Sequence, residues 1–308
     1  MHESSERDPN QFSPVFVLAT PRSYSSIVTT MIGQHPQLMG LPELKLFAYP
    51  TVGELHASLP RFWIERGVKH RSPGLVRAVA QCRFGRQDCT TLALALSWLE
   101  ERSHWTGTEM LDSLQHVIAP RSIVEKSPEN VESDDALARL VSAYPRARFL
   151  HLTRHPVATQ RSMQKHLQRT LSSYSADTQP TRYFTAWIDV HTRILALAEA
   201  LPPSRYLRIK AEDILNQPAT HLRSIAGWLG ISTDSEAIGS MTRPQDSVFA
   251  SEGPANSGIV GGNDPDFLRN PSPRPVETPS ALEHPGGWGA NPTLWEATVS
   301  LANRLGYV

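Results

Sequence analysis

The chain carries, at residues 15–27, the stretch Val15-Phe16-Val17-Leu18-Ala19-Thr20-Pro21-Arg22-Ser23-Tyr24-Ser25-Ser26-Ile27. Its first five residues are apolar and include two valines, as is typical of a strand buried on both faces of a parallel sheet. A Pro-Arg-Ser turn ends this strand, and apolar residues then recur at helical spacing from Ile27 to Ile32. We therefore predict a strand that turns directly into a helix. The start of such a helix presents unpaired N–H groups and the positive end of the helix dipole, which stabilise an anion.

The side chains of this turn fit the same chemistry. Arg22 adds a fixed positive charge with a bidentate fork, and Ser25 and Ser26 add hydroxyl groups. The serines fit a role as helix caps equally well, so the turn alone leaves both interpretations open. It lacks the glycines and the lysine of a Walker A loop, which disfavours nucleotide kinases of that type. The absence of a Gly-x-Gly-x-x-Gly fingerprint disfavours a dehydrogenase.

The rest of the chain repeats this alternation of strand and helix. Short strands are predicted at 122–124, 148–153 and 205–209, and helices at 91–101, 110–118, 136–144, 183–201, 218–229 and 293–305. This order indicates an α/β fold, a parallel sheet flanked by helices, with ligands at the carboxyl ends of its strands. Residues 1–13 are predicted to form a flexible tail, and residues 14–308 a single domain.

Composition excludes several classes of function. Thirty Lys and Arg residues balance thirty Asp and Glu residues, so the zero net charge disfavours a nucleic-acid partner. No apolar run is long enough for a membrane span, and the polar N-terminus does not have the pattern of a secretory signal. Cys82 and Cys89 have neither zinc-ligand spacing nor partners for a disulfide framework. We expect a cytoplasmic protein without a metal site or a membrane partner.

The composition changes after about Arg243. Residues 244–292 contain nine prolines and seven glycines. Such an irregular segment is either a surface linker or an active-site cover. Trp288, within its Gly-Gly-Trp-Gly sequence, fits stacking on a ligand or ordinary packing.

A second candidate anion site follows the strand predicted at 148–153. Arg154 lies at the end of this strand, Pro156 suits the first turn of the next helix, and Ser162 follows Arg154 by about two helical turns. Both side chains can therefore face one crevice. A surface ion pair for Arg154 and an ordinary helix contact for Ser162 form the alternative.

Together these segments resemble the sulfotransferases that use 3′-phosphoadenosine 5′-phosphosulfate (PAPS). The strand, the Pro-Arg-Ser-x-Ser-Ser turn and the helix, followed by His-Pro and then Glu, are similar to the family's 5′-phosphosulfate loop. Arg154 and Ser162 are similar to its 3′-phosphate motif. Glu125-Lys126-Ser127-Pro128 resembles a segment of the bacterial branch, and Leu305-Gly306-Tyr307 resembles its ending. The resemblance extends over residues 15–230.

This resemblance implies a P-loop-like sheet, PAPS as the donor, 3′-phosphoadenosine 5′-phosphate (PAP) as the product, and no metal. The donor contacts that it implies are Arg22, Ser23, Tyr24, Ser25, Ser26, Arg154 and Ser162. At Tyr24 the chain departs from the family, which usually has a small residue there. Because tyrosine resists a positive φ, either the loop is right-handed at this position or the ring points into the acceptor site.

The acceptor hydroxyl must lose its proton to a base. Glu43 follows the loop helix through a proline-bounded turn that can return it to the site, and in one branch of the family the matching glutamate is the base. A salt-bridged carboxylate is the alternative, with His151, His155 and His166 as competing bases. Lys126 fits a contact to the sulfonate or a bridge to a carboxylate. Charge stabilisation would come from Arg22, as expected by analogy with phosphoryl transfer.

The sequence thus predicts a PAPS-dependent sulfotransferase of secondary metabolism. By in-line transfer with a carboxylate base, it would move a sulfuryl group to a hydroxyl of a small or carrier-bound metabolite. The alternatives are a small-molecule kinase and a catalytically silent nucleotide-binding module on the same core.

Overall fold

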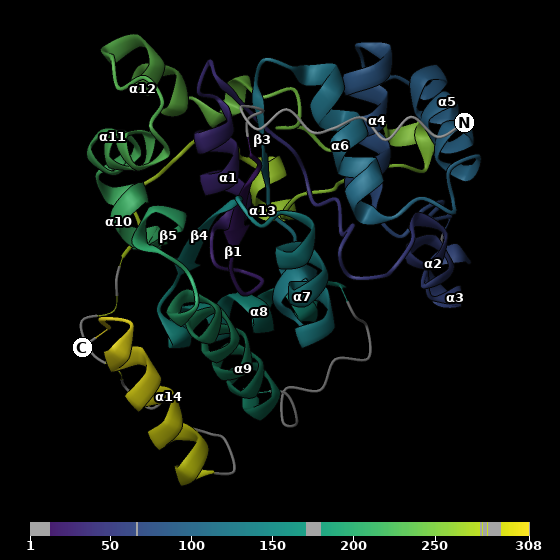
Figure 1. Ribbon diagram of the computed structural model, residues 1–308. Coiled ribbons are helices and arrows are strands. Elements are labelled where there is room, and N and C mark those ends of the chain that lie inside the picture. Colours follow the sequence, from purple (N-terminus) through teal and green to yellow (C-terminus); the bar gives the residue numbers. More distant parts are fainter. Residues whose placement is uncertain are drawn as a thin grey trace.

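The computed structural model describes residues 13–65, 67–170, 180–277, 279, 282 and 291–307. Five parallel strands form a single sheet in this part of the chain, in the order β2-β3-β1-β4-β5. Figure 1 labels β1, β3, β4 and β5. The strands are β1 Val15–Leu18, β2 Leu38–Gly40, β3 Ser122–Glu125, β4 Arg148–Thr153 and β5 Tyr206–Lys210. The predicted parallel α/β sheet is confirmed, with β1 at its centre.

Helices cover both faces of the sheet. They are α1 Ser25–Gly33, α2 Val52–Ala57, α3 Arg61–Ile64, α4 Pro73–Phe84, α5 Cys89–Glu100, α6 Gly107–Ile118, α7 Asp134–Ala143, α8 Pro156–Thr170, α9 Pro180–Glu199, α10 Ala211–Asn216, α11 Pro218–Leu229, α12 Ser235–Met241, α13 Pro265–Arg269 and α14 Pro292–Arg304. Apolar residues of α1, α10, α11 and α12 pack on one face. Those of α2, α4, α5, α6, α7 and α9 belong to the core on the other face.

Strand β1 is apolar on both faces because it lies between these two cores. Val15 and Val17 pack toward α1, whereas Phe16 and Leu18 pack on the opposite side. Phe16 stacks on Phe149 of β4, with ring centroids 6.0 Å apart. This explains why the strand lacks the alternation of polar and apolar residues that a half-exposed strand shows.

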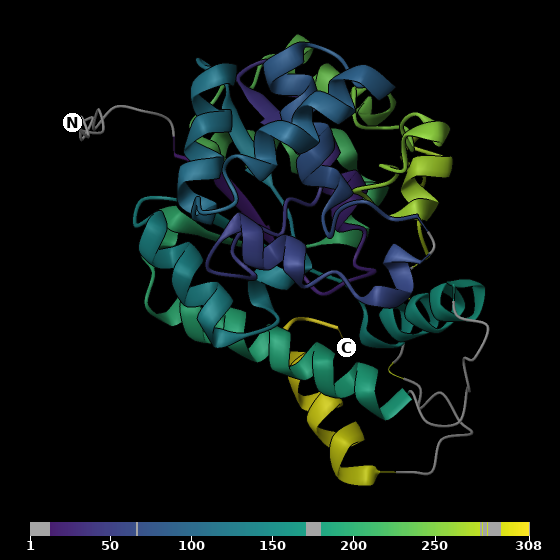
Figure 2. The same ribbon diagram turned by 90° about the vertical axis from the view of Figure 1, so that its right-hand side faces the viewer.

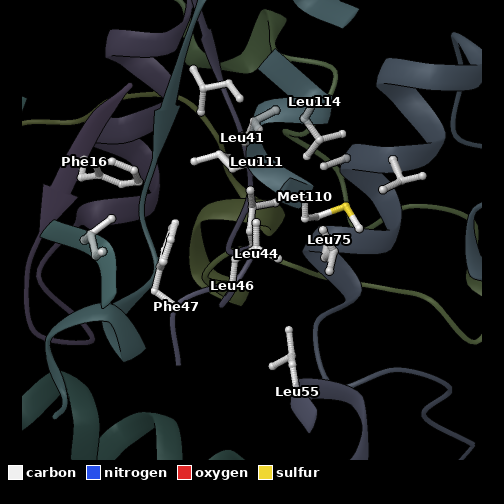
Figure 3. Packing of buried hydrophobic residues seen from close by; sticks show 14 of the residues in the cluster. Phe16, Leu41, Leu44, Leu46, Phe47, Leu55, Leu75, Met110, Leu111 and Leu114 are labelled. Atoms are coloured by element: carbon white, nitrogen blue, oxygen red, sulfur yellow. The ribbon is translucent and has the colours of Figure 1, made fainter. Parts of the chain in front are cut away.

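The segment that carries Glu43 is held by the larger core. Leu41 and Leu44 flank Glu43 and are buried beside Met110, Leu111 and Leu114 of α6 (Figure 3). Leucine burial of this kind contributes about 1.5–3 kcal/mol per side chain. The polar side chain of Glu43 is therefore carried on a turn whose flanking residues are fixed by apolar packing.

A glycine at the start of α4 permits this close approach. A Cβ atom at Gly74 would lie 2.3 Å from the carbonyl oxygen of Glu43, so a larger residue there would force the two segments apart. At the start of α2, Thr51 and Glu54 form the capping box that their spacing in the sequence predicts.

Near the C-terminus, helix α14 packs along α9 (Figure 2). Trp187 and Leu195 of α9 share a cluster with Leu301 of α14 and with Leu305 and Tyr307 beyond it. This packing brings the end of the chain back to the sheet.

Some strands and helices of the structure were not predicted from the sequence. The edge strand β2 spans only Leu38–Gly40, too short for a periodic signal. Helix α4 was missed because Arg77 interrupts its apolar stripe, although Arg77 is fully buried and donates to the carbonyl oxygens of Ser251 and Gly261. The predicted tail at 1–13 and the residue Trp288 fall outside the described residues, except for residue 13.

Candidate active site

The loop between β1 and α1 has an unusual backbone. Arg22 and Tyr24 have φ angles of 66° and 60°, in the left-handed region that non-glycine residues rarely adopt. Tyr24 is the N-cap residue of α1, and no side chain caps this helix start. The serines therefore do not act as caps, and a right-handed loop at Tyr24 is ruled out. Strain of this kind persists only where surrounding contacts hold it.

Arg154 supplies those contacts. Its guanidinium donates to the carbonyl oxygen of Arg22 at 2.5 Å and to the hydroxyl of Tyr24 at 2.9 Å. The same group lies 3.9 Å from the centroid of the Tyr24 ring, a cation–π contact. One side chain from the end of β4 thus supports both left-handed residues of the loop.

Arg154 is in turn held by residues that the sequence analysis did not assign to the site. Trp187 of α9 donates to the carbonyl oxygen of Arg154 at 3.3 Å. Glu212 of α10 accepts from the next amide, at His155, and from the hydroxyl of Tyr307, at 2.9 and 3.1 Å. The only signal of Tyr307 in the sequence was the family-like ending of the chain.

The two predicted anion motifs meet in space. Arg22 donates through Nε to Ser162 of α8 at 3.2 Å, and its other two nitrogens bind the carboxylates of Asp264 and Asp266. A cavity of about 970 Å³ opens here. Its lining includes Arg22, Tyr24, Ser26, Arg154 and Ser162, together with further residues of α8 and of the segment from Asp264 to Pro279.

Behind the loop lies the pair of Lys126 and Glu43. The ammonium of Lys126 donates to Ser26 Oγ at 2.9 Å and to Glu43 Oε1 at 2.5 Å. Lys126 is 2% exposed and Glu43 21% exposed, so the carboxylate has access to solvent that the ammonium lacks. Neither residue lines the large cavity, but Ser26 joins them to it. The bridge from Lys126 to a carboxylate is thereby observed.

Ser26 is poised to donate a hydrogen bond. Its Oγ accepts from Lys126 and also from the amide of Asp264, at 2.9 Å. A hydroxyl has two acceptor lone pairs and one donor hydrogen. Because both lone pairs are used, the hydrogen remains for an anion in the cavity that Ser26 lines.

The turn bearing Glu43 is clamped to the end of β3. The amide of Leu44 donates to Glu125 Oε1 at 3.3 Å, and the amide of Lys45 donates to Ser127 Oγ at 2.8 Å. Ser127 itself donates to Glu125. Complete burial raises the pKa of Glu125 to about 7, although these hydrogen bonds oppose the effect.

Ser23 and two of the competing histidines face elsewhere. Ser23 is fully buried, with its hydroxyl 2.6 Å from that of Thr20. His151 is fully buried, 2.8 Å from His191. His155 packs edge-on against Tyr307, and burial lowers the pKa of His155 to about 4.

The third competing histidine, His166, lies on α8. Burial, followed by the positive charge of Arg22, lowers the pKa of His166. Of the four candidate bases, Glu43 is the one bonded to Lys126. The described residues contain no group of three or more His, Cys, Asp or Glu side chains suited to a metal ion, and none of their helices is long and apolar enough to cross a bilayer.

The chain is similar to known proteins. The model of the sulfotransferase family matches residues 14–235, which include the loop, Lys126, Arg154 and Ser162. The chain belongs to the sulfotransferase family. The predicted resemblance is therefore confirmed, and this sulfotransferase carries its family's fold in the parallel sheet described above.

Two solved structures are similar to this sulfotransferase along its whole length. The sulfotransferase domain from the curacin biosynthetic pathway has a TM-score of 0.77 at 20% identity, covering 96% of this chain and 97% of that domain. The sulfotransferase domain from the Synechococcus PCC 7002 olefin synthase has a TM-score of 0.71 at 23% identity, covering 100% and 98%. At this identity the likeness establishes the fold.

A curated relative matches over a shorter stretch. The omega-hydroxy-beta-dihydromenaquinone-9 sulfotransferase Stf3 of Mycobacterium bovis is 26% identical over 98 residues. The match covers 30% of this chain and a quarter of the relative's length.

Proposed function

We propose that this sulfotransferase uses PAPS and transfers its sulfuryl group to the hydroxyl of a small or carrier-bound metabolite. The observation that carries the proposal is the convergence of the β1–α1 loop, Arg154 and Ser162 on one cavity of about 970 Å³. Arg22 and Arg154 of its lining, together with the uncapped start of α1, suit a ligand with two separate anionic groups.

The donor set fits PAPS. Arg22, Ser25, Ser26 and the first amides of α1 would hold the 5′-phosphosulfate. Arg154 and Ser162 would hold the 3′-phosphate, and Arg154 Nε is buried without a hydrogen-bond partner in the described structure. Tyr24 lines the cavity beneath the Arg154 guanidinium and offers its ring as a contact surface. For Ser23 we propose a contact through the backbone, because its hydroxyl is engaged by Thr20.

When bound, PAPS supplies the sulfuryl group, and PAP leaves. In this proposal Glu43 accepts the proton of the acceptor hydroxyl at its partly exposed carboxylate. Lys126 orients that carboxylate through their 2.5 Å contact and fixes Ser26 through the 2.9 Å bond. Arg22 and Ser26 offer donors to the negative charge that develops on the leaving side. The chain therefore supplies positioning and charge stabilisation, the terms that dominate phosphoryl transfer as well.

The proline- and glycine-rich segment fits the role of a cover. Its residues from Asp264 to Pro279 include several that line the cavity, and Gly262 accepts the amide of Glu43 at 2.7 Å. We propose that part of segment 244–292 closes over the bound donor and acceptor.

Calorimetric titration with PAP, adenosine 5′-phosphate and ADP tests the donor assignment. We expect PAP to bind much more tightly than either of the other two, because only PAP carries the 3′-phosphate. Arg154→Ala should weaken the affinity for PAP by roughly one to two decades, because a charge-assisted hydrogen bond is lost. The affinity of this variant for adenosine 5′-phosphate should fall much less.

The matched control is Arg223→Ala, which removes an exposed arginine that donates to Thr233 and lies outside the cavity lining. It should leave PAP affinity unchanged. An equal loss of affinity for PAP and for adenosine 5′-phosphate in Arg154→Ala would contradict the role of Arg154 at the 3′-phosphate. Preference for ADP would instead support the kinase alternative.

A further inference from the structure

Each of the three nitrogens of the Arg22 guanidinium is bound by the protein itself. Nε donates to Ser162, and the two terminal nitrogens donate to the carboxylates of Asp264 and Asp266. Its side chain is only 9% exposed. All three nitrogens are therefore engaged, and an incoming phosphosulfate must compete with these partners for a bidentate contact to this arginine.

The two carboxylates come from a segment anchored at the same loop. The amide of Asp264 donates to Ser26 Oγ at 2.9 Å, and Asp264 Oδ1 caps α13 by accepting the amide of Asp266 at 2.8 Å. Two negative charges thus lie at the candidate anion site, held there by the backbone. A donor that carries phosphate and sulfate charges would repel them unless they move away from Arg22.

We propose that Asp264 and Asp266 set the affinity of the donor site by occupying Arg22 as internal counter-anions that the donor must displace. This inference rests on the proposed function, because it takes Arg22 as a phosphosulfate ligand. The exchange is made by side chains: the carboxylates leave the guanidinium when the donor binds and return as PAP departs. They belong to the donor-exchange step and do not contact the reacting atoms.

Asp266 also forms ion pairs with two other arginines, which remain available when it leaves Arg22. Arg169 of α8 lies 3.1 Å from its carboxylate, and Arg269 also pairs with it. Burial acts to raise the pKa of Asp266. The hydrogen bond and charge of Arg22, together with the charges of Arg269 and Arg169, outweigh burial and lower this pKa. The carboxylate is therefore charged at neutral pH, and its alternative ion pairs limit the cost of releasing Arg22.

The internal pairs reduce donor affinity by mass action. If only a fraction of the molecules has Arg22 free, the apparent affinity equals the intrinsic affinity multiplied by that fraction. Removing one charge from a partly exposed pair should then tighten PAP binding by roughly twofold to tenfold, and removing both by roughly tenfold to fiftyfold.

Calorimetry with PAP as the probe tests this directly on Asp264→Asn, Asp266→Asn and the double variant. Asparagine keeps the cap of α13, since its side-chain oxygen can still accept the Asp266 amide. The matched control is Asp246→Asn, which removes a carboxylate of the same segment that pairs with Arg243 outside the cavity lining. Circular dichroism melting identifies any variant that has lost its fold.

Tighter PAP binding in the Asp264 and Asp266 variants, with the control unchanged, supports the proposal. Unchanged or weaker binding in folded variants overturns it, because the carboxylates would then merely hold Arg22 in place. Equal tightening in the control would also overturn it, since long-range charge alone would then explain the gain. If the wild-type protein and every variant fail to bind PAP, the proposed function falls, and this inference falls with it.

Discussion

The buried carboxyl of Glu125 should make the stability of the protein depend on pH in a way that one substitution removes. Glu125 accepts from the amide of Leu44, from Ser127 and from the side-chain amide of Asn130. Glu125→Gln keeps the size of the side chain and one of its acceptor oxygens. The new amide group can be satisfied by a flip of Asn130, whose Oδ1 is buried without a partner among the described residues.

The expected magnitude follows from the pKa of Glu125. Burial raises it from its usual value of 4.5 to about 7, which corresponds to a cost of about 3 kcal/mol for holding the carboxylate in the folded state. Because the folded pKa lies above the unfolded one, the folded state takes up a proton first as the pH falls. Glu125 therefore destabilises the protein above pH ~7, and this destabilisation is relieved as the pH falls toward the unfolded pKa.

Urea unfolding of the wild type and of Glu125→Gln, followed by circular dichroism between about pH 5 and pH 8.5, measures this effect. The free energy of unfolding of the variant relative to the wild type should be about 2–3 kcal/mol higher at the alkaline end than at the acidic end. Histidine titrations occur in both proteins, so they cancel in the difference.

Glu129→Gln serves as the control of opposite sign. Burial acts to raise the pKa of Glu129, but the charge of Lys45, 2.6 Å away, outweighs it, so the pKa of Glu129 is lowered. Stability from this carboxylate is lost only below its usual pKa, so its variant should show a nearly constant difference from about pH 5 to 8.5. A flat profile for Glu125→Gln would refute the reasoning, because Glu125 would then titrate alike in the folded and unfolded states.

Two further predictions concern catalysis and the covering segment. Glu43→Gln should lower turnover by ~10²–10⁴ while PAP affinity measured by calorimetry stays nearly unchanged. Near-wild-type turnover in Glu43→Gln, together with loss of turnover in His166→Gln, would identify that histidine as the base. PAP with an acceptor should slow tryptic cleavage after the exposed Arg269, because segment 244–292 closes over the filled cavity. Cleavage at an equal rate with and without ligands would indicate a plain linker.

The sequence carried enough information for four of the five strands and for the donor loop. The apolar run at 15–19, the Pro-Arg-Ser turn and the helical spacing after it are local signals, and each acts within a few residues. The same holds for Arg154 at the end of β4 and for Pro156 at the start of α8. For this reason the parallel α/β fold could be predicted without coordinates, whereas the pairing of the two anion motifs was implied by the resemblance to the sulfotransferases.

Backbone strain and contacts between residues far apart in the chain could not be predicted from the sequence. Nothing in the local sequence shows that Arg22 and Tyr24 adopt positive φ, because the support comes from Arg154, more than a hundred residues away. From the sequence, Lys126 fits either a contact to the sulfonate or a bridge to a carboxylate, and only the packing of Leu41 and Leu44 places Glu43 at its ammonium.

The sequence by itself thus determined four of the five strands, most of the longer helices and where anion-binding side chains stand along them. Tertiary structure alone decided which of these side chains meet. Lys126 and Glu43 are separated by 83 positions, and Arg22 and Asp264 by 242. The physical reason is that secondary structure depends on short-range periodicity, whereas such contacts depend on strand order, on the close approach at Gly74 and on the path of the segment beyond Gly262.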